Sequence, residues 1–131
     1  MEEALIARML ATAGITDLVG QRVTPKRRTQ GGDLPAVVLH RIDGGPDYPI
    51  HGGASGLIES RVQVDCWAES WLSAATVARA VMAALSGATF TQDGVRFDAI
   101  FVVAQRDDTD DENGTPLFRF SLDLMVHHAT A

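Results

Sequence analysis

The chain has 131 residues, of which 46% are hydrophobic, with a single cysteine and a formal net charge of −6. This length predicts one domain, residues 1–131, with one hydrophobic core, and the negative charge argues against general nucleic-acid binding. No apolar run approaches the roughly 18 residues of a membrane helix, the acidic start Met1-Glu2-Glu3 is unlike a secretory signal, and Cys66 alone allows no internal disulfide, which favours folding in a reducing cytoplasm.

The beginning of the chain predicts one helix and a further helical turn. Glu2–Ala13 has apolar residues at helical spacing and acidic residues at its start, and Gly14 is placed to end the helix. Ile15–Val23 is short and mixed, and predicts a helical turn with Thr16 as its cap and Gly20 at its end.

A basic loop and a strand follow. Pro25–Pro35 predicts an exposed loop that contains the successive cations Lys26, Arg27 and Arg28. Three cations in a chain of this net charge are more typical of an exposed loop or a salt-bridging subunit contact than of a DNA site. The β-branched residues of Ala36–Ile42 predict a strand.

A second loop, Asp43–Gly56, is rich in glycine and proline. Such a length without predicted structure is unusual in a compact domain, so the segment is either functional or a projecting hairpin arm. It contains Tyr48, Pro49, Ile50 and His51, and exposed aromatic and apolar side chains of this kind anchor interfaces. The alternative, that the loop folds back over its own sheet, stays open.

The clearest pattern is a strand followed by a helix. Leu57–Trp67 alternates with period two, which predicts a half-buried strand. Its apolar face carries Ile58, Val62, Val64 and Cys66, and its polar face carries Glu59, Arg61, Gln63 and Asp65. Trp71–Leu85 has apolar residues three and four apart, which predicts an amphipathic helix, with Ser70 as its N-cap and Gly87 just past its end.

The remainder of the chain predicts three more strands. Asp93-Gly94 is a two-residue hairpin signal between Ala88–Gln92 and Val95–Val103. Asp107–Gly114 is expected to form an acidic loop, and the alternating apolar residues of Leu117–His127 predict the last strand.

Together these elements predict an α+β fold. We expect an antiparallel sheet of four to five strands with two helices packed on one face, plus a projecting loop or hairpin. The other face of the sheet is expected to meet water or a partner. Ala129-Thr130-Ala131 is expected to be a loose end.

No pattern in the sequence predicts catalysis or cofactor binding. Cys66 lies on the apolar face of its strand, where a thiol is neither activated nor accessible. Gly53-Ala54-Ser55-Gly56 lacks the glycine that a nucleophile elbow needs two residues after its serine. The glycines of this loop are not followed by the Lys-Ser/Thr pair of a phosphate loop.

The acidic and histidine residues predict no metal site either. Asp108, Asp110 and Glu112 have the spacing of calcium ligands, but Asn113 and Arg119 stand where a calcium loop needs glycine and glutamate. Of the four histidines, His40, His51, His127 and His128, only the last two are adjacent, and neighbours on a strand point to opposite faces.

The surface therefore carries the functional prediction. An antiparallel sheet that does not close leaves edges, which invite pairing with another chain. We expect an assembly subunit, and its candidate contact residues are Lys26, Arg27, Arg28, Tyr48, Pro49, Ile50 and His51. A small ligand-binding or enzymatic α+β domain stays open as the competing class, and a deep pocket lined by converging polar groups would support it.

Four segments carry a family resemblance: Asp17–Pro25, Leu34–Val38, Arg61–Ala68 with the helix behind it, and Phe118–Leu124. With them, nearly the whole chain resembles the tail-completion family of long-tailed bacteriophages and phage-derived gene transfer agents, also called tail terminators or head-to-tail joining proteins. The resemblance implies a structural virion protein without catalysis, located at the head–tail junction and assembled in the bacterial cytoplasm.

Members of this family are similar in forming a ring, usually a hexamer, that caps the tail tube and joins it to the head connector, or stopper, protein. Such a ring closes head to tail, so each subunit offers two different surfaces. DNA is expected to pass through the lumen without specific binding, since a chain of net charge −6 favours a negative lumen. Another head–tail connector subunit or a tail-tube subunit of the same particle stays open as an alternative.

Overall fold

A computed structural model of the chain describes residues 1–28, 32–46, 58–112 and 114–130. These residues contain three helices and six strands. The helices are α1 (Glu2–Leu10), α2 (Ala13–Val19) and α3 (Trp71–Leu85). The strands are β1 (Val23–Pro25), β2 (Ala36–Pro46), β3 (Ile58–Ala68), β4 (Phe90–Gln92), β5 (Val95–Glu112) and β6 (Thr115–Thr130). None of the helices in these ranges combines the length and the apolarity that crossing a membrane requires.

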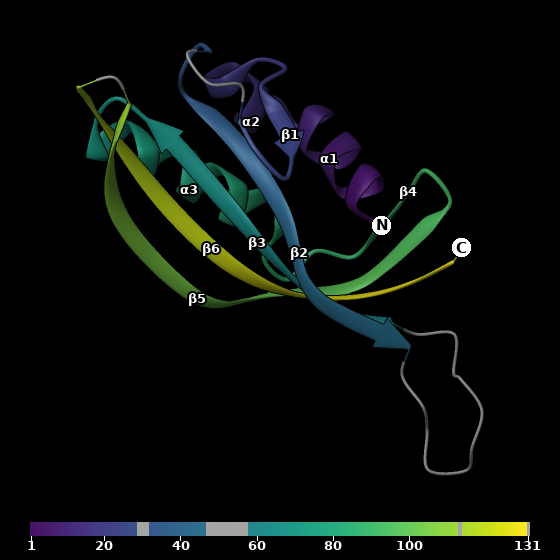
Figure 1. The fold of residues 1–131 in the computed structure, drawn as a ribbon. Helices are drawn as coiled ribbons and strands as arrows, with labels where there is room; N and C mark the ends of the chain where they lie inside the picture. The colour runs from purple at the N-terminus through teal and green to yellow at the C-terminus, as the bar shows by residue number, and fades with distance from the viewer. Residues whose placement is uncertain (29–31, 47–57, 113, 131) are drawn as a thin grey trace.

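The strands of the described residues form one curved sheet in the order β1-β2-β3-β6-β5-β4 (Figure 1). β1 runs parallel to β2, with Val23 opposite Val37, and the other neighbours are antiparallel. The fold is therefore α+β as predicted, but the sheet is mixed and has one strand more than the four to five expected. The described residues also contain three helices, where two were expected, because the short segment Ala13–Val19 is a helix of its own. β1 escaped prediction because three residues are too few to show a period, and its pairing is set by β2 rather than by its own sequence.

One hydrophobic core joins the three helices to one face of the sheet. α3 packs against β3 and β6, and α1 contacts β1 and β2 (Figure 1). The core residues of the helices include Leu5, Met9, Ile15, Val19, Val77, Val81 and Leu85, and those of the sheet include Val37, Leu39, Val62, Val64, Cys66, Phe97, Ile100, Leu122, Leu124 and Val126. The apolar faces predicted for β3 and α3 are thus confirmed. We call the opposite side of the sheet the open face.

The bounds of the first two helices differ from the prediction. α1 ends at Leu10 and α2 begins at Ala13, so Gly14 lies inside α2 instead of ending the first helix. Thr12, not Thr16, is the N-cap residue of α2, because the backbone is extended there. Its side chain makes no capping hydrogen bond, and its hydroxyl donates to the Arg8 carbonyl of α1 at 2.8 Å. Gly20 follows α2 with a φ of +60°, as its predicted role at a helix end requires.

α3 has the bounds and the caps that the sequence predicts. The Ser70 hydroxyl accepts a hydrogen bond from the Ser73 backbone N–H at 3.2 Å, which satisfies one of the free donors of the first turn. Gly87 adopts a φ of +71° directly after the C-cap residue, Ser86.

The cap at Ser70 gives a testable prediction. Ser70→Ala removes the acceptor and is expected to lower the free energy of unfolding by about 1 kcal/mol, measured by urea denaturation. Ser73→Ala is the matched control, since it keeps the backbone donor and removes only a hydroxyl from the helix surface. An equal loss in both variants would contradict the capping role of Ser70.

Two predicted loops are partly strand. Asp43–Pro46, expected to begin the second loop, belongs to β2 and pairs with the start of β3 beyond a bulge at Ile42. Asp107–Glu112, expected to be an acidic loop, continues β5 and pairs with Thr115–Phe120 of β6. The pairing of long neighbouring strands overrides the low strand propensity of these acidic and glycine residues.

The end of the chain is also paired. Ala129 and Thr130, expected to be a loose end, lie opposite Arg96 and Val95 in the β5–β6 ladder. The Asp93-Gly94 hairpin is confirmed, and both residues have positive φ, +50° and +77°, as a type I′ turn requires.

Two irregularities in β5 redirect its side chains. The register with β6 shifts between Phe97 and Ala99 and again between Val102 and Ala104. As a result Phe97 and Ile100 enter the core, whereas Phe101 and Val103, on the same side as Phe97 by simple alternation, are 51% and 47% exposed. The bulges thus place large apolar side chains on the surface of the sheet.

Candidate interaction surface on the open face

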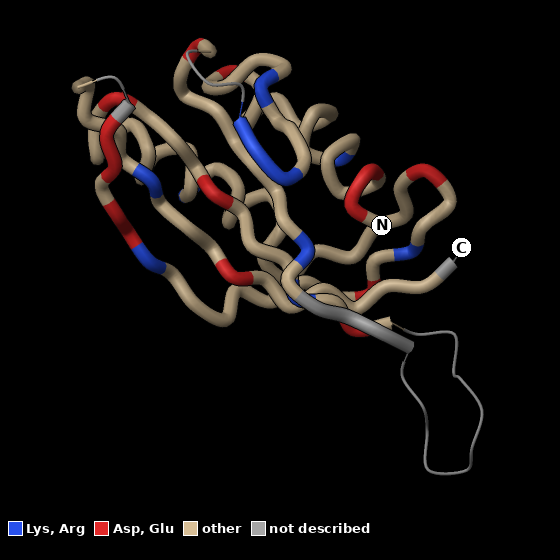
Figure 2. Tube along the Cα trace, viewed as in Figure 1, with Lys and Arg blue, Asp and Glu red and all other residues tan. Residues whose placement is uncertain are grey.

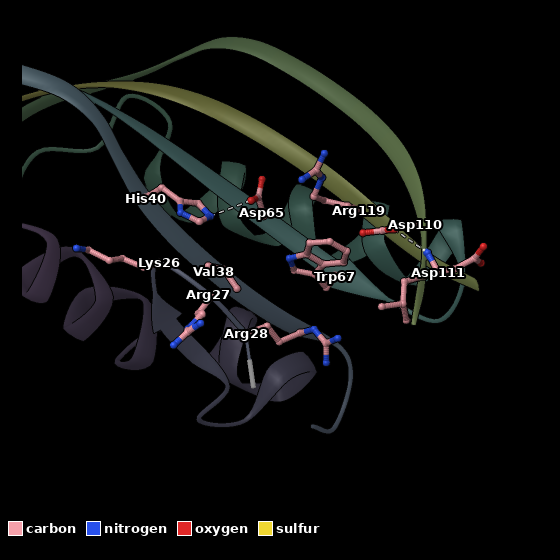
Figure 3. A pocket seen from close by; sticks show the side chains of 11 residues that line it. Lys26, Arg27, Arg28, Val38, His40, Asp65, Trp67, Asp110, Asp111 and Arg119 are labelled. Carbon is pink, nitrogen blue, oxygen red and sulfur yellow. Dashed lines mark hydrogen bonds and ion pairs between the residues drawn. The ribbon is translucent and has the colours of Figure 1, made fainter. Parts of the chain in front are cut away.

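The open face carries a groove of about 350 Å³ that crosses four strands of the sheet (Figure 3). One wall is the basic loop, which we define as Lys26, Arg27 and Arg28. The floor comes from β2 and β3, and the other wall from β5 and β6. The lining residues beyond the basic loop are Val38, His40, Asp65, Trp67, Asp110, Asp111, Leu117 and Arg119.

The basic loop is held in place by hydrogen bonds to residues of β1 and β2. The Lys26 N–H donates to the Leu39 carbonyl at 2.9 Å, and the Thr24 hydroxyl donates to the Arg27 carbonyl at 3.1 Å. Lys26 has a φ of +68°, so the chain turns sharply there. Lys26 and Arg27 are exposed and Arg28 is half-buried. The exposure that the sequence predicts for this loop is confirmed for the first two of its residues.

Trp67 lies between two guanidinium groups on the floor of the groove (Figure 3). Arg119 lies 5.4 Å from the centre of the indole ring and Arg28 lies 5.9 Å from it. Arg119 also donates to a carboxylate oxygen of Asp108 at 3.0 Å. No sequence pattern predicts a contact role for Trp67 or Arg119, although alternation places Trp67 on the polar face of its strand, where a large aromatic residue is unexpected.

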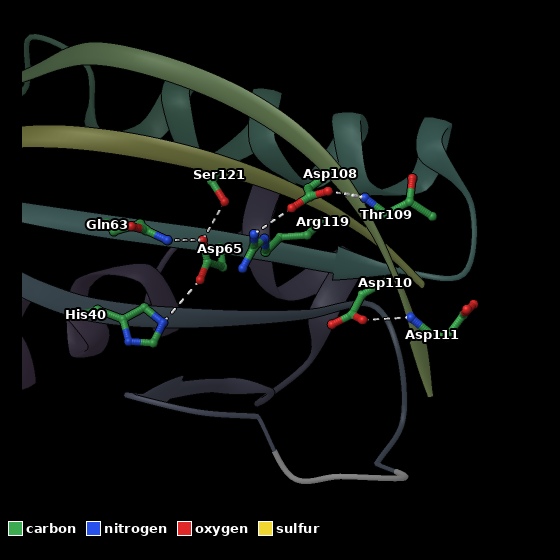
Figure 4. A network of polar contacts seen from close by, with 9 residues as sticks. All are labelled: His40, Gln63, Asp65, Asp108, Thr109, Asp110, Asp111, Arg119 and Ser121. Carbon is green, nitrogen blue, oxygen red and sulfur yellow. Dashed lines mark hydrogen bonds and ion pairs between the residues drawn. The ribbon is translucent and has the colours of Figure 1, made fainter. Parts of the chain in front are cut away.

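Asp65, two residues before Trp67 on β3, is the centre of a polar network (Figure 4) and is buried. One carboxylate oxygen accepts from Ser121 Oγ at 2.6 Å and from Gln63 Nε2 at 2.8 Å. The other lies 3.1 Å from His40 Nε2. Asp65 is on the polar face, as predicted, but it is only 2% exposed because these three neighbours cover it. The network fixes the relative positions of β2, β3 and β6.

The adjacent histidines point to opposite faces, as predicted. His127 meets Phe101 edge to face at 5.8 Å, whereas His128 is buried with Nε2 2.9 Å from the Ser60 hydroxyl. Burial lowers the pKa of His128 and so favours the neutral ring. Within the described ranges, no three His, Cys, Asp or Glu residues are grouped to hold a metal ion.

Cys66 is fully buried in the core, and burial raises the pKa of its thiol far above the ordinary range. We therefore expect a thiol reagent to leave Cys66 unmodified in the folded protein at about pH 8, near the ordinary thiol pKa. Modification should become complete in guanidinium chloride. The absorbance of the thiolate that the reagent releases measures the extent of modification. Rapid modification of the native protein would contradict the placement of Cys66 in the core.

The candidate contact residues of the second loop, Tyr48, Pro49, Ile50 and His51, lie outside the described residues. The open face brings the basic loop together with residues from β2, β3, β5 and β6, which sequence spacing alone does not connect. The arrangement offers exposed cations, an aromatic ring and carboxylates along one groove, which is chemistry suited to binding a polar surface or chain segment.

Residues 3–128 match a protein family described as "Tail completion protein gp17". The chain belongs to the tail completion family. This membership confirms the resemblance seen in the sequence and makes the chain a structural protein of phage-type tails. None of the curated proteins matches it.

The fold has a counterpart in a solved structure titled "Virion of native gene transfer agent (GTA) particle". The two chains are 21% identical, the TM-score is 0.72, and the match covers 98% of this chain and 94% of the other. The likeness therefore extends over nearly the whole of both chains and concerns their fold.

Proposed function

We propose that this tail completion protein is a tail terminator. In this proposal residues 1–131 form one domain without catalytic activity, and copies of it form a ring, expected to be a hexamer. The ring caps the tail tube and joins it to the head connector at the head–tail junction of the virion. The observation that carries the proposal is the family match over residues 3–128.

The borders of the sheet support an assembly role. β4 pairs only with Val95–Phe97 of β5, and β1 pairs only with Val37–Leu39 of β2. Most of β5 and the far half of β2 therefore have no strand on their outer sides among the described residues. Open sheet edges of this length invite protein partners unless something covers them.

The contact residues belong to this proposal. We propose Lys26, Arg27 and Arg28 as contacts with a neighbouring subunit or the tail tube, and Tyr48, Pro49, Ile50 and His51 as contacts of the same kind. The net charge of −6 supports a lumen through which DNA slides without specific binding. Assembly of the ring takes place in the bacterial cytoplasm, before the head and tail join.

Deletion of the gene in a strain that produces the particles tests this function. A tail terminator is required for joining, so we expect complete heads and separate tails by electron microscopy, with joined particles restored by the gene supplied in trans. A tail-tube subunit would leave no tails, and a ligand-binding or enzymatic domain would leave the particles joined. Either result would overturn the proposal.

The location of a tagged copy separates a terminator from a head connector. In a strain blocked at the joining step by loss of another connector protein, heads and tails separate on a density gradient. We expect the tagged chain to sediment with the tails, at one end of each. A tagged chain that sediments with the heads would instead identify a head-connector subunit.

A further inference from the structure

The longest open border of the described sheet is the outer half of β5. The pairing of β4 with β5 reaches only as far as Phe97, and the Gly87 N–H donates to the Ile100 carbonyl at 2.8 Å. Beyond this point, no described strand pairs with the outer side of Phe101–Glu112, which we call the β5 edge. The Thr109 and Asp111 backbone N–H groups donate to the carboxylates of Asp108 and Asp110 at 2.8 Å. The side chains of the edge are open to contacts with another chain.

The β5 edge is acidic, which disfavours pairing between the β5 edges of two copies. Asp107, Asp108, Asp110 and Asp111 are all exposed along it, and Figure 2 shows them as a red run in the far half of β5. Two β5 edges placed side by side would bring these carboxylates together, and like charges across a sheet border are destabilising. A partner for this edge therefore needs a basic border.

An exposed aromatic residue lies next to the same edge. Trp71 and Leu72 begin α3 and are 45% and 63% exposed. The Trp71 indole N–H donates to a carboxylate oxygen of Asp107 at 2.9 Å, which fixes the ring beside the acidic residues. An exposed tryptophan flanked by carboxylates suits a guanidinium or ammonium group, which combines an ion pair with a cation–π contact.

The basic loop lies at the opposite border of the sheet, directly after β1, and appears as a blue stretch in Figure 2. Within the part of the chain that the structure describes, Lys26 and Arg27 form no ion pair, although Asp110 and Asp111 stand across the groove in the same subunit. These two cations are therefore available to carboxylates of another copy.

We propose that copies of this chain join head to tail, with the β5 edge of one copy against the basic loop of the next. The inference rests on the ring of the proposed function and assigns the contacts that close it. Because the two borders differ in charge and lie on opposite sides of the sheet, the contact is heterologous and leaves one free border of each kind on every partial assembly. Repetition of the contact then leads to a closed ring.

Charge reversal at each border tests this contact. The acidic variant is Asp110→Lys with Asp111→Lys, and the basic variant is Lys26→Glu with Arg27→Glu. Each variant has two borders of like charge, so we expect each to reduce the yield of joined particles in the complementation assay on the order of 100-fold. The control, Glu3→Lys with Asp17→Lys, reverses two exposed charges on α1 and α2 and should complement normally.

Mixing the two variants gives the decisive result. In a strain that expresses both, the reversed β5 edge of the acidic variant matches the reversed loop of the basic variant. The unreversed β5 edge of the basic variant likewise matches the unreversed loop of the acidic variant, so a ring with an even number of subunits forms by alternation. We expect joined particles to return to within about threefold of the wild-type yield, and likewise when all four substitutions are combined in one chain. Full activity of either variant alone, or failure of both rescues, would overturn the proposal.

A cross-link provides evidence that does not depend on the reversed charges. One chain carries Arg27→Cys and a second, tagged differently, carries Asp110→Cys; Cys66 is buried and does not interfere. Oxidation of particles that contain both chains should give a disulfide-linked pair of the two tags. Linked pairs of the same tag, or no pairs, would contradict the assignment.

The outcomes separate this inference from the proposed function. If the tagged wild-type chain lies at the tail end but the cross-link and both rescues fail, the ring stands and closes through other surfaces. If the tagged chain lies on the heads or is absent from the tail end, the terminator role fails, whatever the contact between copies.

Discussion

Replacement of Phe97 by alanine is expected to lower the free energy of unfolding by about 3–5 kcal/mol. Phe97 is fully buried, and its ring stacks on Phe90 at 4.7 Å and lies 6.3 Å from the ring of His128. The phenyl ring thus joins the β4–β5 hairpin to β6, and its removal leaves a cavity that these paired strands cannot easily close.

Phe101→Ala is the matched control for this substitution. Phe101 is on the same strand but is 51% exposed, so its loss should change the free energy of unfolding by about 1 kcal/mol or less. Urea denaturation followed by tryptophan fluorescence measures both variants. If both variants lost the same free energy of unfolding, this would contradict the placement of Phe97 in the core and Phe101 on the surface.

Removal of the Asp65 carboxylate has the second largest expected effect. Asp65→Ala leaves the Ser121 hydroxyl and the Gln63 amide without their acceptor in a site that is 2% exposed. Because hydrogen bonds to charged groups contribute roughly 1.5–3 kcal/mol each, we expect the free energy of unfolding to fall by about 3 kcal/mol. The same urea denaturation measures this change.

Two further variants show whether the stability lost in Asp65→Ala comes from the buried hydrogen bonds. Asp111→Ala removes an exposed carboxylate from the same face and should change stability by less than about 0.5 kcal/mol. Asp65→Asn keeps one oxygen to accept from Ser121 and Gln63 and should recover part of the loss. If Asp65→Ala is no more damaging than Asp111→Ala, the buried network contributes nothing to stability.

The elements that sequence alone predicted well are those with a strong local period. β3 and α3 combine a clear alternation, a helical apolar stripe, and caps at Ser70 and Gly87, so local and tertiary preferences agree. The Asp93-Gly94 turn was predictable for the same reason, because only residues that tolerate positive φ fit it.

The elements that sequence missed depend on partners far away in the chain. Asp107–Glu112 has the composition of a solvated turn, but β6 supplies a ladder of backbone partners that keeps it in the sheet. β1 is a strand only because β2 lies beside it. After Phe97, a bulge moves the following side chains to the opposite face of the sheet from the one that simple alternation predicts.

The candidate surface was only partly visible in the sequence. A run of three cations drew attention to the basic loop, but nothing local indicated that it faces Trp67, Asp110 and Arg119 across a groove. The opposition of an acidic and a basic border arises from the strand order, which places β1 and β5 near opposite sides of the sheet. That order became visible only with the fold.

The proposed function requires that copies of the chain form a single ring at the end of the tail. Electron cryomicroscopy of purified particles, combined with a count of copies per particle by quantitative mass spectrometry, tests it directly. We predict one ring at the head-proximal end of the tail tube, with the copy number of that ring alone and with adjacent subunits meeting through unlike borders. Density for the chain repeated along the tube, or confined to the head, would contradict the account.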